Sequence, residues 1–305
     1  MPNIQSHRFK TISEFHKFRG LPTPEHPLIS VIDVALMNEL LMDEFLVIKD
    51  FYSIAMKRNL NYKVKYGQNS GDFDEGVMFF TSPGQLLKLT FEKDTPVRQS
   101  GWMLLVHPDF LWNTPLAKTI RHYEFFSYAV NEALFLSEKE ETMVTGIVQY
   151  MEQEYHANID QFSQTVILAQ LELLLTYSER FYQRQFITRK IANHQILARL
   201  EDILDGYFKS DQLIKNGLPT VGYIADSLNV SPNYLGSMLK VLTGQNAQQH
   251  LHSKLIELAK EKLSTTDLSV SEIAYALGFE HSQSFSKLFK NKTDLSPLEF
   301  RQSFN

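Results

Sequence analysis

Two stretches near the carboxyl end of the chain repeat one another: IADSLNVSPNYLGSMLK at residues 224–240 and IAYALGFEHSQSFSKLFK at residues 273–290. Apolar positions recur 49 residues apart in the first part of the repeat and 50 residues apart in the second part, as from Ile224 to Ile273 and from Leu235 to Phe285. The extra residue falls in a turn. A repeat of this kind indicates two copies of one supersecondary unit.

Each copy is typical of two short helices joined by a turn. The turns fall at Asn229 in the first copy and at Gly278 in the second. Ser231-Pro232 has the residue types that favour an N-cap and a first helical position, and His281-Ser282 is the equivalent helix start in the second copy. The pattern predicts two helix-turn-helix units, in which the second helix enters the major groove of DNA.

Residues 246–264 lie between the two copies and carry apolar residues at helical spacing. They predict one helix of about 18 residues, roughly 27 Å long. Adjacent major grooves on one side of B-DNA are about 34 Å apart, so such a helix would set both units into consecutive grooves of one asymmetric site. The alternative is that the two helical hairpins only pack a core, as in any small α-helical domain.

Composition limits the other classes of protein. A chain of 305 residues with 43% hydrophobic content is long enough for two domains. The absence of cysteine excludes a disulfide scaffold, a thiolate zinc site and a cysteine nucleophile. No secretory signal and no run of 18 apolar residues is present, which predicts a cytoplasmic protein that does not bind membranes. The net charge of −5 gives no sign of nucleic-acid binding, although Lys287, Lys290 and Lys292 crowd one segment.

The amino-terminal part has a different pattern. Short β-like runs separated by turn signals predict a small antiparallel barrel or sandwich between about residues 44 and 112. The runs are FLVIKDFYSIAMK (45–57), YKVKY (62–66), VMFFT (77–81), LLKLTF (86–91) and WMLLV (102–106). Ser137 and Glu140 form a capping-box pattern that opens a predicted helix at 138–155.

A second predicted helix, at residues 160–184, carries an apolar stripe that we expect to be buried within the domain, with burial against a second subunit as the alternative. The stripe consists of Phe162, Val166, Ile167, Leu171, Leu174, Leu175 and Phe181. The segment 187–195 is more polar and is the candidate boundary between two domains, at residues 1–187 and 188–305.

With these motifs the chain resembles the AraC/XylS family of bacterial transcription regulators, over about residues 196–304. The similarity is carried by residues 224–244, by KLIELAKEKLSTTDLSVSEIAYALGF (254–279) and by SQSFSKLFKNKTDLSPLEFR (282–301). The resemblance implies seven helices, two helix-turn-helix units and sequence-specific binding to double-stranded promoter DNA. It also implies a regulator that is most often an activator and that contacts RNA polymerase.

Mapped onto this chain, the resemblance places the base-reading positions in the two recognition helices at Asn233, Gly236, Ser237, Ser282, Gln283, Ser284 and Lys287. Ser237 departs from the family, where arginine is common. Gln283, like Asn233, can pair with adenine, and Lys287 can donate to guanine. Because the first unit lacks a long donor at Ser237, we expect the second unit to carry more of the sequence specificity.

Lys240, Lys290 and Lys292 are candidates for contacts with DNA phosphates, which set affinity without distinguishing sequences. The alternative for each is a solvated surface charge. Ser296, followed by Pro297, opens the last predicted helix and could present backbone N–H groups to a phosphate, or could simply cap the helix.

In this family the amino-terminal domain is often a cupin-like barrel that binds a small effector or pairs two subunits. The complete expectation is therefore an α+β multidomain protein: a cupin-like β-barrel with trailing helices, followed by an all-α domain with two helix-turn-helix units joined by a long helix. Tyr52, Phe79, Phe80 and Trp102 are candidates for an effector pocket, with ordinary barrel core as the alternative.

Two further hypotheses stay open. One is a DNA-binding homodimer without a small effector, controlled by abundance or by a protein partner. The other is a metal-dependent cupin enzyme, which would need histidines and a carboxylate at barrel spacing. Histidines in the chain are scattered instead, at His7, His16, His26, His107, His122 and His156, and no nucleophile-elbow, Walker or dinucleotide-binding pattern is present. We therefore expect no cofactor and no catalytic residue.

Overall fold

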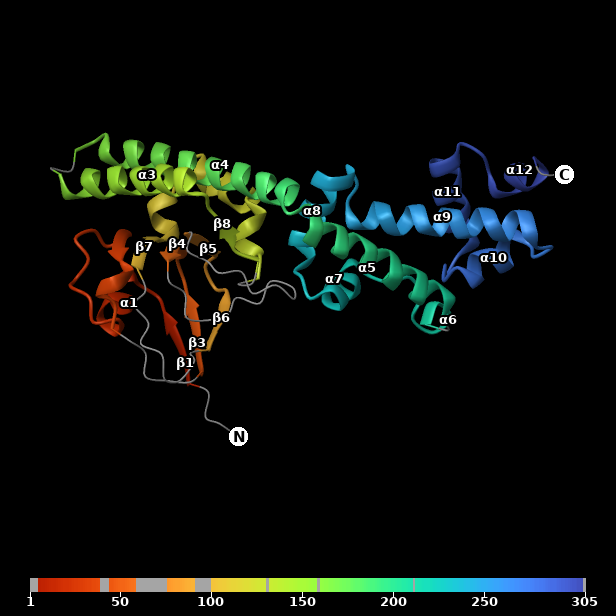
Figure 1. The fold of residues 1–305 in the computed structure, drawn as a ribbon, viewed down its shortest axis with the longest axis horizontal. Coiled ribbons are helices and arrows are strands. Elements are labelled where there is room, and N and C mark those ends of the chain that lie inside the picture. Colours follow the sequence, from red (N-terminus) through yellow and green to blue (C-terminus); the bar gives the residue numbers. More distant parts are fainter. Residues whose placement is uncertain are drawn as a thin grey trace. The chain divides into compact units, whose positions relative to one another are not determined.

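The computed structural model describes residues 5–38, 44–58, 76–90, 100–129, 132–157, 160–210 and 212–303. The chain divides into two compact parts, Met1–Gln185 and Phe186–Asn305, called here the N-terminal and C-terminal domains. The first is rich in β-strands and the second is helical (Figure 1). The predicted run YKVKY lies outside the described residues.

The N-terminal domain contains two sheets. In the larger sheet, neighbouring strands are antiparallel. Its strands are, in spatial order, β2 (Ile29–Asp33), β7 (Ser100–Val106), β4 (Tyr52–Arg58), β5 (Val77–Thr81) and β8 (Leu134–Phe135). The smaller sheet consists, in spatial order, of β1 (Gln5–Phe9), β3 (Glu44–Lys49) and β6 (Leu86–Thr90). The described strand pairs within the predicted β region, residues 44–112, are antiparallel, and β1, which lies before that region, pairs with β3 in parallel. The described strands form two sheets, and their register does not close into a barrel.

The longest predicted β run divides between the two sheets. Residues before Asp50 form β3 and those after Phe51 form β4. Asp50 forms a 3.0 Å ion pair with Arg8, and its N–H donates to the carbonyl of Phe9, which holds the crossing point against β1. Tertiary contacts at Asp50 therefore divide into two strands a β run that the sequence pattern predicts as one.

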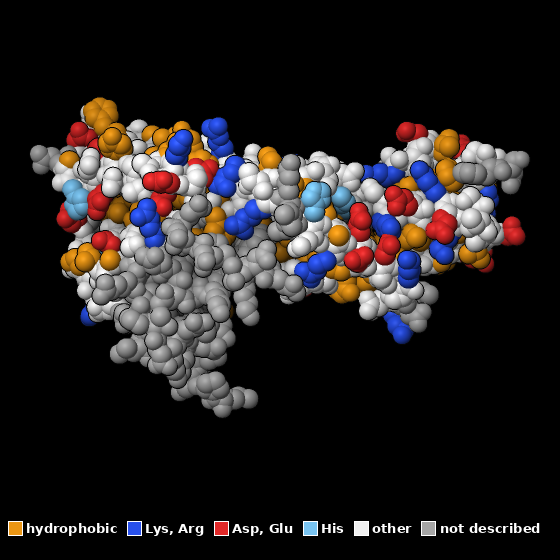
Figure 2. All heavy atoms as spheres, viewed as in Figure 1, with side chains coloured by type: hydrophobic (Ala, Val, Ile, Leu, Met, Phe, Trp, Pro, Cys, Tyr) orange, Lys and Arg blue, Asp and Glu red, His pale blue; other side chains and the backbone are white. Residues whose placement is uncertain are grey.

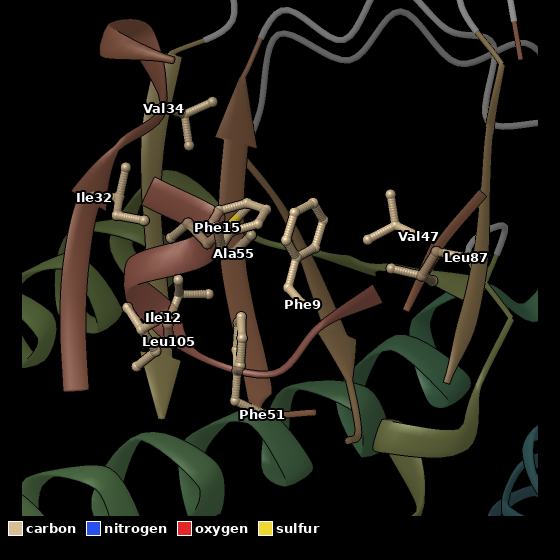
Figure 3. Packing of buried hydrophobic residues seen from close by; sticks show 11 residues of the cluster. Phe9, Ile12, Phe15, Ile32, Val34, Val47, Phe51, Ala55, Leu87 and Leu105 are labelled. Carbon is tan, nitrogen blue, oxygen red and sulfur yellow. The ribbon is translucent and has the colours of Figure 1, made fainter. Parts of the chain in front are cut away.

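A core cluster lies between the two sheets and beneath helix α1, Ile12–Phe18 (Figure 3). Phe9 of β1 packs its ring at right angles to that of Phe15, with 5.5 Å between ring centroids. Val47 and Leu87 of the smaller sheet face Ala55 of the larger sheet across this cluster. The two sheets therefore form a sandwich with an aromatic centre.

Two long helices, α3 (Glu138–His156) and α4 (Ser163–Thr188), run side by side in the N-terminal domain (Figure 1). The predicted capping box at Ser137 and Glu140 is confirmed. The indole N–H of Trp102 on β7 donates to the hydroxyl of Thr145 on α3 at 3.1 Å, which attaches this helix to the larger sheet.

The apolar stripe of α4 is buried within the domain over most of its length: Ile167, Leu171, Leu174, Leu175 and Phe181 are inaccessible or nearly so. Phe162, which directly precedes the helix, and Val166 in its first turn are exposed, at 62% and 37%. Intramolecular packing therefore accounts for five of the seven predicted positions. The segment 187–195 is largely helical, since α4 ends at Thr188 and α5 begins at Lys190.

The remaining short helices of the N-terminal domain are η1 (Val34–Leu36), η2 (Pro108–Leu111), α2 (Leu116–Thr119), η3 (Ile120–His122) and η4 (Glu124–Ser127). The C-terminal domain contains α5 (Lys190–Lys209), α6 (Gln212–Asn216), α7 (Val221–Leu228), α8 (Pro232–Thr243), α9 (Ala247–Thr265), α10 (Val270–Ala276), α11 (Ser282–Thr293) and α12 (Pro297–Gln302). The short α6 is additional to the seven helices expected. None of the helices in the described ranges has the length and apolar character needed to cross a membrane.

Candidate nucleic-acid interface

The first helix-turn-helix unit consists of α7 and α8. Asn229 ends α7 with a left-handed backbone, φ 57°, a conformation that asparagine tolerates better than most residues. Ser231 caps α8, because its hydroxyl accepts a hydrogen bond from the N–H of Tyr234, and Pro232 follows within the first turn. The turn and helix start expected from the sequence are confirmed.

The second unit consists of α10 and α11. Gly278 has φ 78°, a conformation that favours glycine, and a Cβ atom there would lie 2.9 Å from the Cδ1 of Leu213 on α6, which would have to shift. His281 occupies the N-cap position of α11 but makes no side-chain capping bond. The start of this recognition helix thus differs from that of α8.

The two units share a buried pattern that follows the sequence repeat. Ile224 and Ile273 are inaccessible, as are Leu239 and Phe289 at matched positions of the recognition helices. Larger aromatic residues fill the second core, where Phe289 packs edge-on against Phe300 of α12 with centroids 5.4 Å apart. The two helical hairpins are therefore built alike. In each recognition helix, α8 and α11, the face opposite the buried one is left for other contacts.

Helix α9 connects the units and is fixed at both ends. Asn246 and Gln249 form a capping box at its start. Lys254 on α9 pairs with Asp205 on α5 at 2.5 Å, and this hydrogen-bonded contact raises the pKa of Lys254. At the other end, the Arg301 guanidinium donates to the carbonyls of Leu263 and Leu268. No local pattern in the sequence indicates this role of Arg301.

The expected base-reading residues lie on the two recognition helices and are not part of the core. Asn233, Gln283, Ser284 and Lys287 are exposed, and Gly236, Ser237 and Ser282 are half-buried. A Cβ atom at Gly236 would meet no atom within 4 Å, so this position lies against open space. The structure thus brings together three of these residues on α8 and four on α11, and their contacts with bases remain predictions.

Lys240, Lys290 and Lys292 are also exposed, each in the last turns of a recognition helix. On the face shown in Figure 2, Lys and Arg side chains of the C-terminal domain alternate with Asp and Glu side chains. Lys292 contributes, after burial, to lowering the pKa of His252 on α9. These exposed lysines supply positive charge on the recognition helices of a domain that is close to neutral overall.

Ser296 caps α12, and the cap is already occupied. Its hydroxyl accepts from the N–H of Glu299, while its own N–H donates to the Glu299 carboxylate at 2.7 Å. These hydrogen bonds lower the pKa of Glu299. A phosphate at Ser296 would have to displace that carboxylate, so the capping alternative accounts for the observed geometry.

The four aromatic residues expected to line an effector pocket do not all lie on one face of the larger sheet. The strand register places Tyr52, Phe80 and Trp102 on one face of the larger sheet and Phe79 on the other, beside Ala55. Trp102 on β7 is bound to α3 through Thr145, and β4 separates its strand from β5, which carries Phe79 and Phe80. Phe80 and Trp102 are buried and Tyr52 and Phe79 are half-buried, and effector contacts by any of them remain a prediction.

Phe79 and Phe80 do line a hollow, together with Phe125, Tyr128 and Tyr182. Its volume is about 20 Å³, enough for a water molecule. The Phe125 and Tyr182 rings stack with 5.6 Å between centroids. Tyr52 is absent from the lining and packs against Phe126 instead. In this conformation the hollow has no room for a small-molecule effector.

Within the described residues, no group of three or more His, Cys, Asp or Glu side chains is arranged to hold a metal ion. Several of the histidines have other contacts: His16 makes hydrogen bonds with the Pro22 carbonyl and the Ser30 hydroxyl, and His156 pairs with Glu25. A metal-dependent cupin site therefore has no support in these ranges.

Comparison with known proteins identifies the class of the C-terminal domain. A family model described as a helix-turn-helix domain matches residues 224–303, and the resemblance to AraC/XylS regulators is confirmed for this part of the chain. The cupin-like nature of the N-terminal domain is not established by the match.

Among curated relatives, the chain is 34% identical over 82 residues to the HTH-type transcriptional regulator YijO of Escherichia coli K12, which covers 27% of this chain and 29% of the relative. It is 30% identical over 161 residues to the transcriptional activator RhaS of Escherichia coli O1:K1, covering 52% of this chain and 53% of the relative. The chain thus spans about half of RhaS and less of YijO.

Among solved structures, the C-terminal domain of the response regulator yesN from Fusobacterium nucleatum is 30% identical, with a TM-score of 0.30, and the match covers 34% of this chain and 95% of that one.

Proposed function

We propose that the protein is a sequence-specific DNA-binding transcription regulator of the AraC/XylS type. The main support is the pair of similar helix-turn-helix units. Each has a buried core and a recognition helix whose expected base-reading residues are exposed or half-buried. In the proposal α8 and α11 enter successive major grooves from one monomer. The match to helix-turn-helix regulators over residues 224–303 supports it.

Binding in the second unit depends most on Gln283 and Lys287, which present an amide and an ammonium to base edges. Lys240, Lys290 and Lys292 contact phosphates and set the dependence on salt. By extension from RhaS, which is named an activator, promoter binding by this protein activates transcription through contact with RNA polymerase.

The N-terminal domain controls this binding, in the proposal, by holding a small effector. A second mode of control is homodimerisation. It is supported by exposed apolar residues at the start of and along α4: Phe162 directly precedes the helix, and Val166 and Leu173 lie seven residues apart on it, close to one helical face. Light scattering of the purified chain at increasing concentration distinguishes the two modes, because an effector-controlled monomer keeps a constant mass.

DNase footprinting on the DNA upstream of the protein's own gene and of its neighbours tests the proposal. We expect protection over two successive helical turns on one side of the duplex. Binding of equal strength to unrelated duplex, or protection confined to a single groove, would contradict it. Transcription from the protected promoter, measured with and without the protein, gives the sign of regulation.

A further inference from the structure

Residues 212–217, called here the α6 segment, contact the turn of the second helix-turn-helix unit. They comprise helix α6 and the Gly217 that follows it, and α6 lies beside α10 (Figure 1). Leu213 is 3% exposed, and a Cβ atom built on Gly278 would lie 2.9 Å from the Cδ1 of Leu213 and 3.3 Å from the carbonyl carbon of Gly217. The α6 segment is therefore packed against the turn that directs α11.

The same segment is bonded to the first unit. Tyr223 of α7 donates from its hydroxyl to Oε1 of Gln212 at 3.5 Å. Its ring packs edge-on against the ring of Tyr207 on α5, with 5.2 Å between centroids, and the Tyr207 hydroxyl donates to the Gly217 carbonyl at 3.0 Å. A continuous series of contacts thus runs from α7, through the α6 segment, to the turn between α10 and α11.

The repeated unit does not require this segment. In the second copy, α9 ends at Thr265 and α10 begins at Val270, and residues 266–269 between them are not helical. Before the first copy, residues 210–220 form a longer connection from α5 to α7, and α6 lies within it. Because the second copy folds without a corresponding helix, building a helix-turn-helix unit does not account for the contact that α6 makes with the other copy.

A second connection between the units restricts their relative motion. Helix α9 contacts α8 of the first unit and α10 and α11 of the second. Two bodies joined by one helix can twist about that helix, whereas a second attachment away from its axis prevents the twist. On the α5 side, Asp205 pairs with Lys254 of α9, which closes the series of contacts into a ring. Binding groups need such support, because they must be held within about 10–20° of the productive orientation.

We propose that the α6 segment fixes the orientation of α11 relative to α8 and thereby sets the spacing that the protein accepts between the two DNA segments bound by these helices, called here half-sites. Leu213 and Tyr207 are positioning residues, which act through the recognition helices. The inference rests on the proposed function, because it concerns two helices that bind successive grooves. One added base pair moves the second groove by about 3.4 Å and turns it by about 35°, a change that a rigid pair of units cannot follow.

Distances between spin labels test the connection in the full chain without DNA. The chain contains no cysteine, so Asp226→Cys on α7 and Ser271→Cys on α10 place one label at an exposed position of each unit. Double electron–electron resonance should give a narrow distance distribution, and Leu213→Ala combined with Tyr207→Phe should widen it. Equal widths with and without these two substitutions overturn the proposal.

Leu200→Ala is the matched control for the loss of buried volume. Leu200 lies on α5 and is 2% exposed, close to the 3% of Leu213, so both substitutions remove the same buried atoms from the domain. The control should leave the distance distribution narrow. Tyr207→Phe alone removes a single hydroxyl and preserves the ring, so it keeps the test available if Leu213→Ala fails to fold, as judged by circular dichroism. It should widen the distribution in the same direction, and an unchanged width in this variant also overturns the proposal.

Binding to operators of altered spacing tests the consequence for DNA. The footprinted operator is compared with versions that have one base pair added or removed between the half-sites, and with versions in which one half-site is scrambled. We expect the unsubstituted chain to lose affinity by about tenfold or more on the altered spacings, and the variant with Leu213→Ala and Tyr207→Phe to lose about threefold or less. Affinity for a single half-site should be the same in both proteins.

The spacing effect separates positioning from general damage to the fold. Leu200→Ala should keep the full loss of affinity on the altered spacings. An equal loss in the unsubstituted chain and in the variant overturns the proposal, and so does a weakening of single half-site binding that matches the weakening on the whole operator.

The two measurements keep this proposal distinguishable from the proposed function. If the footprinted operator is bound but the substitutions change neither the label distances nor the spacing effect, the role of the α6 segment is wrong and the proposed function stands. If the substitutions widen the label distances but no DNA sequence is preferred over random duplex, the proposed function is wrong while the α6 segment still joins the two units.

Discussion

At the scale of single residues, the two recognition helices differ in the donors that they present. Ser237 on α8 is short and half-buried, whereas Lys287 on α11 is long and exposed. An ammonium can donate to guanine O6 or N7 across the floor of the major groove, and a serine hydroxyl reaches less far. Sequence specificity should therefore be concentrated in the second unit.

Lys287→Ala should reduce discrimination between the operator and random duplex by about 1–3 kcal/mol, while Ser237→Ala changes it less. Fluorescence anisotropy at fixed salt, with the specific site and with a scrambled duplex, measures both. A larger loss of discrimination in Ser237→Ala than in Lys287→Ala would show that the first unit dominates.

Lys290→Ala should weaken binding to all sequences alike, because a phosphate contact carries no base information. The slope of log Kobs against log salt should fall in magnitude by about 0.9, because one phosphate fewer is neutralised by the protein. Lys262→Ala, on α9 and away from the recognition helices, is the matched control. If the salt slope is the same in both variants, Lys290 is a solvated surface charge.

The stability of the chain should rise between pH 7 and pH 9. Unfolded Lys49 keeps its proton up to a pKa near 10.5, while the folded protein releases it near pKa 7, so the unfolded state binds more protons in this window. The gain from this residue is up to about 2 kcal/mol. Urea denaturation at several pH values measures it. Lys49→Met should flatten the rise and Lys118→Met should not; an equal rise in both variants would remove Lys49 as the source.

At the scale of elements, each helix-turn-helix turn is determined by one residue of special conformation. Asn229 and Gly278 occupy equivalent places and both have positive φ, so the two hairpins bend alike although their sequences differ. Gly278 also lies against α6, whereas Gly236 on α8 lies against open space. The two glycines should therefore respond oppositely to substitution.

Gly278→Ala should lower the free energy of unfolding by more than about 1 kcal/mol, since alanine is strained at positive φ and its Cβ would press on Leu213. Gly236→Ala should raise it by roughly 0.5–1 kcal/mol, because glycine weakens a helix interior. Urea denaturation of the full chain measures both. Similar changes in stability from the two substitutions would refute this account.

At the scale of the whole molecule, the domain division falls inside helix α4. Phe186 belongs to the C-terminal domain, is 2% exposed, and packs edge-on against Tyr234 with centroids 5.1 Å apart. Its carbonyl also accepts a hydrogen bond from the side chain of Asn193. The last residues of α4 are thus part of the core that supports the first recognition helix.

A fragment of residues 186–305 should therefore bind the operator and unfold cooperatively, whereas one of residues 190–305 should be less stable by about 3 kcal/mol or more because it lacks the Phe186 ring. Circular dichroism melting compares the two fragments. The longer fragment should also lose any response to the effector in a transcription assay. A full response without residues 1–185 would show that the N-terminal domain does not control DNA binding.

Much of the C-terminal domain was determined by local sequence. Helix starts, turns and apolar spacing depend on residues within a few positions of one another, so the paired units, the long α9 and the capping residues Ser231 and Asn246 could all be predicted. The same locality explains why the capping box at Ser137 and the helix after it were predictable.

Other features were decided only by the tertiary structure. The division of residues 45–57 between two sheets and the parallel pairing of β1 with β3 both depend on which distant strands meet. So does the cap that Arg301 places on α9. The physical reason is that pairing and burial between distant segments are settled by competition among many contacts of similar energy, which no short stretch of sequence contains.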